Sequence, residues 1–175
     1  MPLLDSARVT VLLADYIAAD AGGKLTAVGA AFTLTGLGPD GHTPPQHVAV
    51  VVDVPPQHLG QDFALGISLV EEGSDAPVLV PGGTGEPEAL RVAQVVQAQA
   101  PSVPGMMVPS TVPGRVQLVL GFPQGLPLQA GSTYRWTVEL DGQSRPEWTA
   151  WFHVPAAAPG PVFGGPAGPS SIPQF

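Results

Sequence analysis

The chain has 175 residues, the length of one compact domain, and 44% of them are hydrophobic, which suffices for a sizeable core. Its net charge of −8 and its few, dispersed basic residues exclude the positive surface that nucleic-acid binding requires. It has no cysteine and no run of about 18 apolar residues, so the sequence excludes a disulfide framework and predicts no membrane-spanning segment.

The first two elements are predicted to be the strands of a β-hairpin. Residues 8–17 are rich in β-branched and apolar side chains, which favours a strand. The pair Gly22-Gly23 indicates a turn, and residues 25–29 then form the second strand. Residues 31–35 keep the period of two that is typical of a strand, and the Gly- and Pro-rich residues 36–46 are expected to form a loop.

Two strands are predicted in the middle of the chain. Residues 47–54 are a nearly continuous apolar run, which is typical of a strand that is buried on both faces or on most of them. Residues 63–70 alternate and predict a half-buried strand. A polar turn over residues 71–75 and a short partner strand at residues 78–80 follow, and residues 81–88 are again expected to form a Gly- and Pro-rich loop.

Residues 89–100 are ambiguous, because their propensities suit a helix while their alternation suits a long strand. We interpret them as a strand, since valine is better placed there. Residues 101–113 contain four prolines and are expected to run extended across the surface. Residues 115–122 then form a clear strand with its apolar side chains on one face.

The strongest pattern lies near the C-terminus. Residues 134–140 alternate between apolar and polar, a turn is expected over residues 141–146, and residues 148–154 resume the alternation. The two runs should pair as an antiparallel hairpin, with Trp136 and Trp148 on the core face. This hairpin is the part of the chain whose pattern dictates a geometry most directly.

Tyr134 stands at the head of a strand, after Leu128 and a turn at Gly131. This arrangement resembles the tyrosine corner of Greek-key sandwiches, in which the hydroxyl bonds to backbone a few residues upstream. The alternative is a tyrosine that only packs its ring. Roughly eight to ten short strands without a convincing helix predict an all-β fold, an Ig-like Greek-key β-sandwich with long Pro- and Gly-rich loops.

The sandwich domain is expected to span residues 1–154, and residues 155–175, hereafter the tail, are expected to form an extended segment. The tail is rich in proline and glycine and carries no charge, so it cannot form a core of its own. Its larger apolar residues are spaced as anchors for a partner: Val162, Phe163, Ile172 and Phe175. The alternative is a tail that folds back on its own domain.

Trp151 is the candidate contact residue within the sandwich domain. It is offset by one position from Ala150 and Phe152, so it should point away from the core. An exposed tryptophan on a neutral surface is typical of a protein contact, and only 11% of the residues are charged. The alternative is that a second layer or the tail covers this side chain.

Residues that could carry catalysis are scattered. Ser68 lacks the second glycine of a nucleophile elbow, and the stretch Gly82–Gly85 lacks the lysine of a phosphate loop. The acidic turn 71–75 offers too few oxygen ligands for calcium. No metal-ligand spacing occurs among the histidines, which are His42, His47, His58 and His153. The sequence therefore predicts no enzyme, no cofactor and no metal site.

Three stretches carry a resemblance to a known family: residues 9–16 (VTVLLADY), residues 23–29, and residues 131–136 with the following Asp141-Gly142. They resemble a family of small, uncharacterised actinobacterial proteins that also occurs in phages of those hosts. The resemblance spans roughly residues 8–154 and leaves the tail outside. The family carries no established activity, so the resemblance implies no functional residues.

Two functions fit these observations. The first is a non-enzymatic structural protein of the virion, a tailed-phage capsid decoration or minor structural protein that binds coat protein or other subunits in an assembled lattice. The alternative is a soluble binding module of the bacterial cytoplasm, for a protein or a small ligand, because the N-terminus lacks the basic and apolar regions of a signal peptide. Self-association into a homo-oligomer fits both functions.

Overall fold

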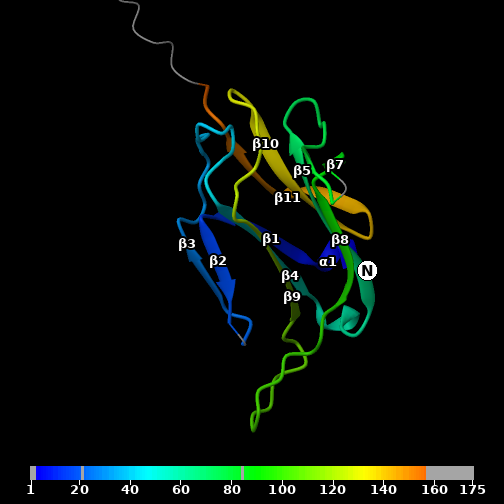
Figure 1. Cartoon of the computed structure of the whole chain (residues 1–175). Coiled ribbons are helices and arrows are strands. Elements are labelled where there is room, and N and C mark those ends of the chain that lie inside the picture. Colours follow the sequence, from blue (N-terminus) through cyan, green and yellow to red (C-terminus); the bar gives the residue numbers. More distant parts are fainter. Residues whose placement is uncertain (1–2, 21, 84, 157–175) are drawn as a thin grey trace, which may run out of the picture.

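The computed structural model describes residues 3–20, 22–83 and 85–156, and nearly all their regular structure is β (Figure 1). One main sheet has the order β1-β4-β9 and contains β1 (Arg8–Ala14), β4 (Gln46–Val54) and β9 (Gly114–Phe122). The other has the order β11-β10-β5-β8 and contains β5 (Asp62–Glu71), β8 (Arg91–Gln97), β10 (Thr133–Leu140) and β11 (Gln143–His153). All neighbouring strands in both sheets are antiparallel.

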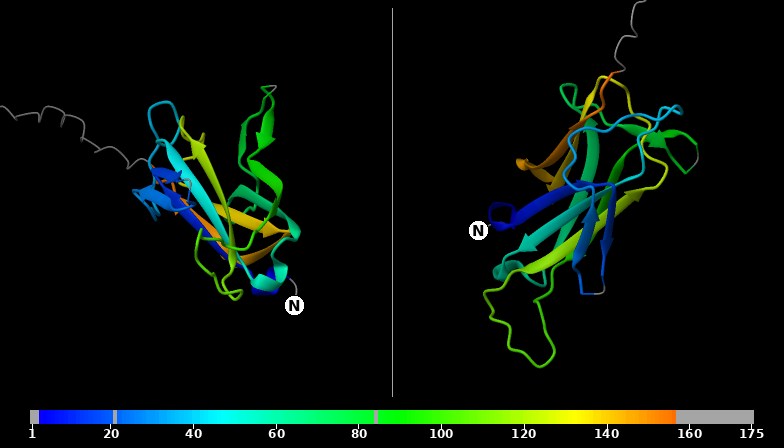
Figure 2. Two further views of the ribbon diagram at one scale, coloured as in Figure 1. Left: turned by 90° about the horizontal axis from the view of Figure 1, so that it is seen from below. Right: turned by 90° about the vertical axis from the view of Figure 1, so that its left-hand side faces the viewer.

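Four small elements lie outside these two sheets. They are the hairpin of β2 (Tyr16–Ala19) and β3 (Leu25–Val28), the hairpin of β6 (Leu79–Pro81) and β7 (Pro87–Ala89), the single-turn helix α1 (Leu3–Ser6) and a 3-10 turn (Pro56–His58). The hairpin β2–β3 and the loop 98–113 project from the same end of the molecule, whereas β6–β7 lies at the opposite end (Figure 2).

The two main sheets share one hydrophobic core, to which every strand of both sheets contributes. The valines of β4 at alternate positions, from Val48 to Val54, are buried in this core. On the other face of β4, Ala49 packs with Ala14 and with Ile17 of the hairpin β2–β3 in a second, smaller cluster. The hairpin covers Ala49, but His47, Val51 and Asp53 on the same face are only half-buried. The prediction that residues 47–54 are buried on both faces is therefore confirmed only in part.

The central part of the ambiguous residues 89–100 forms a strand and none of them is helical, while Ala89 belongs to β7 and residues 98–100 lie in a loop. Arg91–Gln97 is β8, which pairs with β5 along its full length without a register shift. The predicted strands at residues 63–70 and 115–122 are also confirmed, as β5 and β9. The alternation of apolar side chains was thus a sufficient signal wherever one face of a strand packs on the core.

The C-terminal hairpin β10–β11 is confirmed, but its turn is shorter than predicted. Only Asp141 and Gly142 turn the chain, and both have positive φ, 51° and 74°. Asp-Gly is the favoured dipeptide for this two-residue turn, because glycine adopts such backbone angles without strain. Pro146, which the prediction placed in the turn, lies in β11 beside a register shift, where a proline costs no ladder hydrogen bond.

Three other predictions were wrong in detail. The predicted strand 8–17 breaks at Asp15, whose N–H donates to Val28 O (3.1 Å), and only its second part pairs in the hairpin. Residues 31–35 form no strand, since Ala31 has a φ of 61° and its N–H donates to Leu13 O. The short strand near residues 78–80 pairs with β7, in a segment expected to be a loop.

Tyr134 makes the hydrogen bond that the sequence predicted. Its ring is buried, and its hydroxyl oxygen accepts a bond from the backbone N–H of Gln129 at 2.8 Å. The bond ties the start of β10 to the segment that leads into it, five residues upstream. The alternative of a tyrosine that only packs its ring is thereby excluded.

We expect Tyr134→Phe to lower the free energy of unfolding by about 1–2 kcal/mol, because it removes one hydrogen bond and leaves the N–H of Gln129 without a partner. The measurement is urea unfolding followed by tryptophan fluorescence. Tyr16→Phe is the control, because Tyr16 is 52% exposed, and we expect it to change stability by less than about 0.5 kcal/mol. Equal losses in the two variants would contradict a stabilising role for the corner.

Candidate functional site

Trp151 lies on the outer face of β11, and 58% of it is exposed. Its neighbours in the sequence, Ala150 and Phe152, pack on the core, so the alternation of β11 directs Trp151 outward as predicted. The residue opposite it on β10 is Arg135. Within the residues that the structure describes, no second layer covers the ring.

Two open hollows flank the indole of Trp151. One, of about 400 Å³, is lined by Glu72, Thr133, Arg135, Thr149 and Trp151. The other, of about 290 Å³, is lined by Trp151 with Thr149 and Ala150, by residues 11–13 of β1, and by residues 31–33. The first offers polar groups and the second mainly apolar ones. We call the residues of both hollows the Trp151 surface.

The guanidinium of Arg135 is held in place by two carboxylates. It contacts Asp75 Oδ1 at 2.6 Å and Glu72 Oε2 at 3.3 Å. The Nε atom of Arg135 is shielded from solvent and has no hydrogen-bond partner in the described structure. The two carboxylates outnumber the one guanidinium, so the Trp151 surface presents an aromatic and polar contact area with a net negative charge beside it.

The acidic turn between β5 and β6 therefore has a structural role. The sequence interpretation left Glu71, Glu72 and Asp75 as a solvated turn, but Glu72 and Asp75 clamp Arg135 and Glu71 accepts a hydrogen bond from Ser132 Oγ at 2.7 Å. In the part of the chain that the structure describes, no three His, Asp or Glu side chains gather closely enough to hold a metal ion.

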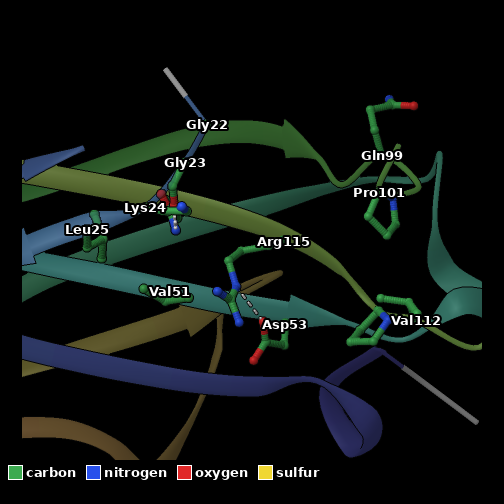
Figure 3. A pocket seen from close by; sticks show the side chains of 12 residues that line it. Gly22, Gly23, Lys24, Leu25, Val51, Asp53, Gln99, Pro101, Val112 and Arg115 are labelled. Carbon is green, nitrogen blue, oxygen red and sulfur yellow. Dashed lines mark hydrogen bonds and ion pairs between the residues drawn. The ribbon is translucent and has the colours of Figure 1, made fainter. Parts of the chain in front are cut away.

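A larger hollow, of about 780 Å³, lies on the outer face of the other sheet (Figure 3). Its floor contains Asp53 of β4 and Arg115 of β9, which form an ion pair of 2.8 Å. The turn at Gly22 to Leu25 forms one wall, and the ends of the loop 98–113 form the other. Lys24, the sole lysine of the chain, lines the first wall, so the hollow carries one more cation than anion.

This larger hollow was not predicted from the sequence. Gln117 Nε2 donates to Gly23 O at 2.7 Å and so fixes the turn of the hairpin β2–β3 against β9, 94 positions away. No local sequence pattern predicts this contact, because Gln117 is simply one of the polar residues of an alternating strand. The only available signal was compositional: Lys24 is the sole lysine in the chain.

The remaining sequence candidates are separated in the structure. Ser68 lies in the middle of β5, opposite Thr137 on one side and Arg91 on the other, so neither neighbour is a general base. His153 Nδ1 lies 2.9 Å from Thr133 Oγ1, beside the Trp151 surface. The tail residues Val162, Phe163, Ile172 and Phe175 lie outside the described residues, and their predicted contact role stays a prediction.

Comparison of this chain with protein-family models, with curated proteins and with solved structures finds no match. The helical segments of the described residues are single turns, far too short to span a bilayer.

Proposed function

We propose that this chain is a non-enzymatic binding and assembly protein whose contact area is the Trp151 surface. The observation that carries the proposal is the exposure of Trp151 between two hollows. A large aromatic ring on a rigid strand loses little conformational entropy on binding, and tryptophan is among the residues that dominate protein interfaces.

The surroundings of Trp151 support a protein partner. The apolar hollow between β1 and β11 can receive a side chain, while Thr133 and Thr149 supply hydroxyl groups at the rim of the polar hollow. Arg135 is already paired with Glu72 and Asp75, so a partner does not have to supply a carboxylate for this guanidinium. A mixed apolar and polar area of this kind is typical of protein interfaces.

In its most concrete form, the proposal is a capsid decoration or minor structural protein of a tailed phage. The resemblance to a family shared by actinobacteria and their phages supports this setting, as do the low charged fraction and the uncharged tail. Such a protein binds the assembled lattice of coat subunits and not the free subunits. Its occupancy then stabilises the assembled state by mass action, without any chemical step.

We also propose that the two main sheets form an Ig-like Greek-key sandwich. The shared core of both sheets supports this assignment, as does the chain path, which changes sheet between β4 and β5, between β8 and β9, and between β9 and β10. The hydrogen bond from the backbone N–H of Gln129 to the hydroxyl of Tyr134 is a further feature of such folds. Ig-like sandwiches commonly display contact surfaces on their strands and loops.

The virion proposal is tested by density-gradient sedimentation of a lysate of the source, with this chain located by mass spectrometry across the fractions. We expect it to migrate with large, nucleic-acid-filled particles at a fixed ratio to a major coat protein. Recovery only near the top of the gradient, as a small species, would reject the virion setting.

The contact area is tested by adding purified variants to particles that lack this chain. We expect Trp151→Ser to reduce the bound fraction at least about tenfold, since a central tryptophan contributes about 2 kcal/mol or more to binding. Tyr16→Ser is the matched control, an exposed aromatic residue on another element, and should bind as the natural chain does. Deletion of residues 155–175 tests the tail separately, and full attachment of the shortened chain would refute the anchor role.

A second candidate function is a binding module for a small anionic ligand. The hollow of about 780 Å³ favours it, because its volume suits a small molecule and Lys24 is free to pair with an anion, having no ion pair in the described structure. Recovery of the chain near the top of the gradient would make this hollow the first place to search for a ligand.

A further inference from the structure

We propose that the free edge of β8 pairs antiparallel with β8 of a second copy of this chain. Among the described strands, only β5 pairs with β8, which is the outermost strand of its sheet (Figure 1). The pairing would join two four-stranded sheets into one continuous sheet across a twofold axis. The inference rests on the fold alone and does not depend on the partner proposed for the Trp151 surface.

The hydrogen bonds of β5 show which backbone groups of β8 point outward. Ala64 of β5 faces β10, because its C=O accepts from Asp141 N and its N–H donates to Asp141 Oδ1, both at 2.8 Å. The next residue, Leu65, therefore directs its backbone to the other side, toward its partner Gln94 in β8. Gln94 is thus bonded to β5.

The same alternation sends the backbone groups of Ala93 and Val95 away from β5. Their N–H and C=O groups have no hydrogen-bond partner on that side within the described residues. The side chain of Val95 is 71% exposed, the largest exposure of any valine in the strands. A regular row of unpaired backbone groups beside exposed valine is a template for another strand.

β8 also lacks the features that protect the other edges from pairing. β11 has a register shift beside Pro146, and the N–H of its residue His153 donates to Thr33 O. β1 is capped near its end by the bond from Ala31 N–H to Leu13 O, and β9 is bonded to the hairpin β2–β3. β8 has no proline and no bulge, and its one charge, at Arg91, is paired with Glu139.

The sequence of β8 is self-complementary when the twofold axis passes beside Gln94. Val92 then faces Val96 of the second copy, and Ala93 faces Val95. Arg91 faces Gln97, so no like charges are opposed. The residues whose backbone N–H and C=O groups point away from β5 lie opposite one another in this register. Each such pair can exchange two backbone hydrogen bonds, which gives up to about eight over the full length of β8. The exposed Val95 acquires an apolar neighbour on its own face of the sheet.

The first test is the mass of the chain in sedimentation equilibrium. We expect the natural chain to reach twice its 17.9 kDa with rising concentration. Val95→Pro should stay monomeric and folded by circular dichroism, because proline removes an outward N–H and leaves the ladder with β5 intact. Val95→Thr, which keeps the N–H and the branched side chain, should dimerise. A monomeric natural chain, or dimers of Val95→Pro, would overturn the proposal.

The second test does not depend on the folding of a proline variant. The twofold axis places Gln94 opposite Gln94 of the second copy. In an antiparallel ladder this is a pair that exchanges no backbone hydrogen bonds, and its Cα atoms lie about 4.5 Å apart. A disulfide can bridge this distance. The chain has no cysteine, so Gln94→Cys can form only an intermolecular disulfide. We expect rapid covalent dimerisation of Gln94→Cys under mild oxidation.

Gln143→Cys is the control for random collision, because residue 143 is exposed beside the turn of the hairpin β10–β11, far from β8 in the strand order. We expect it to remain largely a free thiol under the same conditions. Equal rates of cross-linking in the two variants, or none in Gln94→Cys, would refute the pairing. In the proposed dimer both copies of β11 lie at the outer margins, so two Trp151 surfaces stay open for a bivalent contact.

Discussion

Trp136→Ala is expected to lower the free energy of unfolding by about 3–5 kcal/mol, the range for truncating a buried tryptophan. Trp136 is 1% exposed, lies in β10 at the centre of the shared core, and stacks on Phe122 of β9 with a ring separation of 5.6 Å. The truncation leaves a cavity between the two main sheets, which well-packed neighbours on rigid strands cannot collapse to fill. Urea unfolding followed by circular dichroism measures the loss.

Trp151→Ala is the control for Trp136→Ala, since the two tryptophans lie on adjacent strands but on opposite faces of the same sheet. We expect a change of less than about 1 kcal/mol, because the ring of Trp151 is mostly in water already. Similar losses for both variants would mean that Trp151 is packed as part of the fold, and would contradict its proposed role in binding.

Gly125→Ala is expected to lower the free energy of unfolding by about 3 kcal/mol or more, through two separate effects. Gly125 has a φ of 70°, where a side chain costs about 1–2 kcal/mol. A Cβ atom there would lie 1.8 Å from the backbone carbonyl oxygen of Thr43. Thr43 cannot easily move away, because its N–H donates to Leu126 O and its hydroxyl accepts from Leu126 N–H.

Gly142→Ala separates these two effects. Gly142 has a similar φ of 74°, but a Cβ atom at this position would meet nothing within 4 Å. We expect a loss of only about 1–2 kcal/mol, from the backbone angle alone. Urea midpoints at an unchanged slope give both values. If Gly125→Ala is no more destabilising than Gly142→Ala, the close packing of Gly125 on Thr43 is refuted.

The strands β10 and β11 show how much of a structure a local sequence pattern can predict. Their alternation predicted which residues are buried, and it placed Trp136 and Trp148 in the core and Trp151 outside it. This worked because the backbone of a strand fixes a side-chain period of two, whatever the rest of the fold is. The same reasoning identified β8 as a strand, although its propensities also suited a helix.

The predictions failed where the chain changes direction under tertiary constraints. The strand predicted over residues 8–17 breaks at Asp15, because the hairpin β2–β3 folds over the outer face of β4 and packs Ile17 on Ala49. Composition cannot show this, since residues on both sides of Asp15 are equally good strand formers. The overlong turn at residues 141–146 was avoidable, because Asp-Gly alone is a sufficient turn signal.

The sequence by itself determined the β class, the inward and outward residues of the main strands, the tyrosine corner, and the outward direction of Trp151. Only the tertiary structure decided that Arg135 is clamped by Glu72 and Asp75, that Gln117 fixes a distant turn beside a hollow, and that β8 is an open edge. The physical reason is the distance along the chain over which each kind of interaction acts. Side-chain alternation and turn chemistry act between neighbours in the chain, whereas strand order and the hollows depend on contacts between segments tens of residues apart.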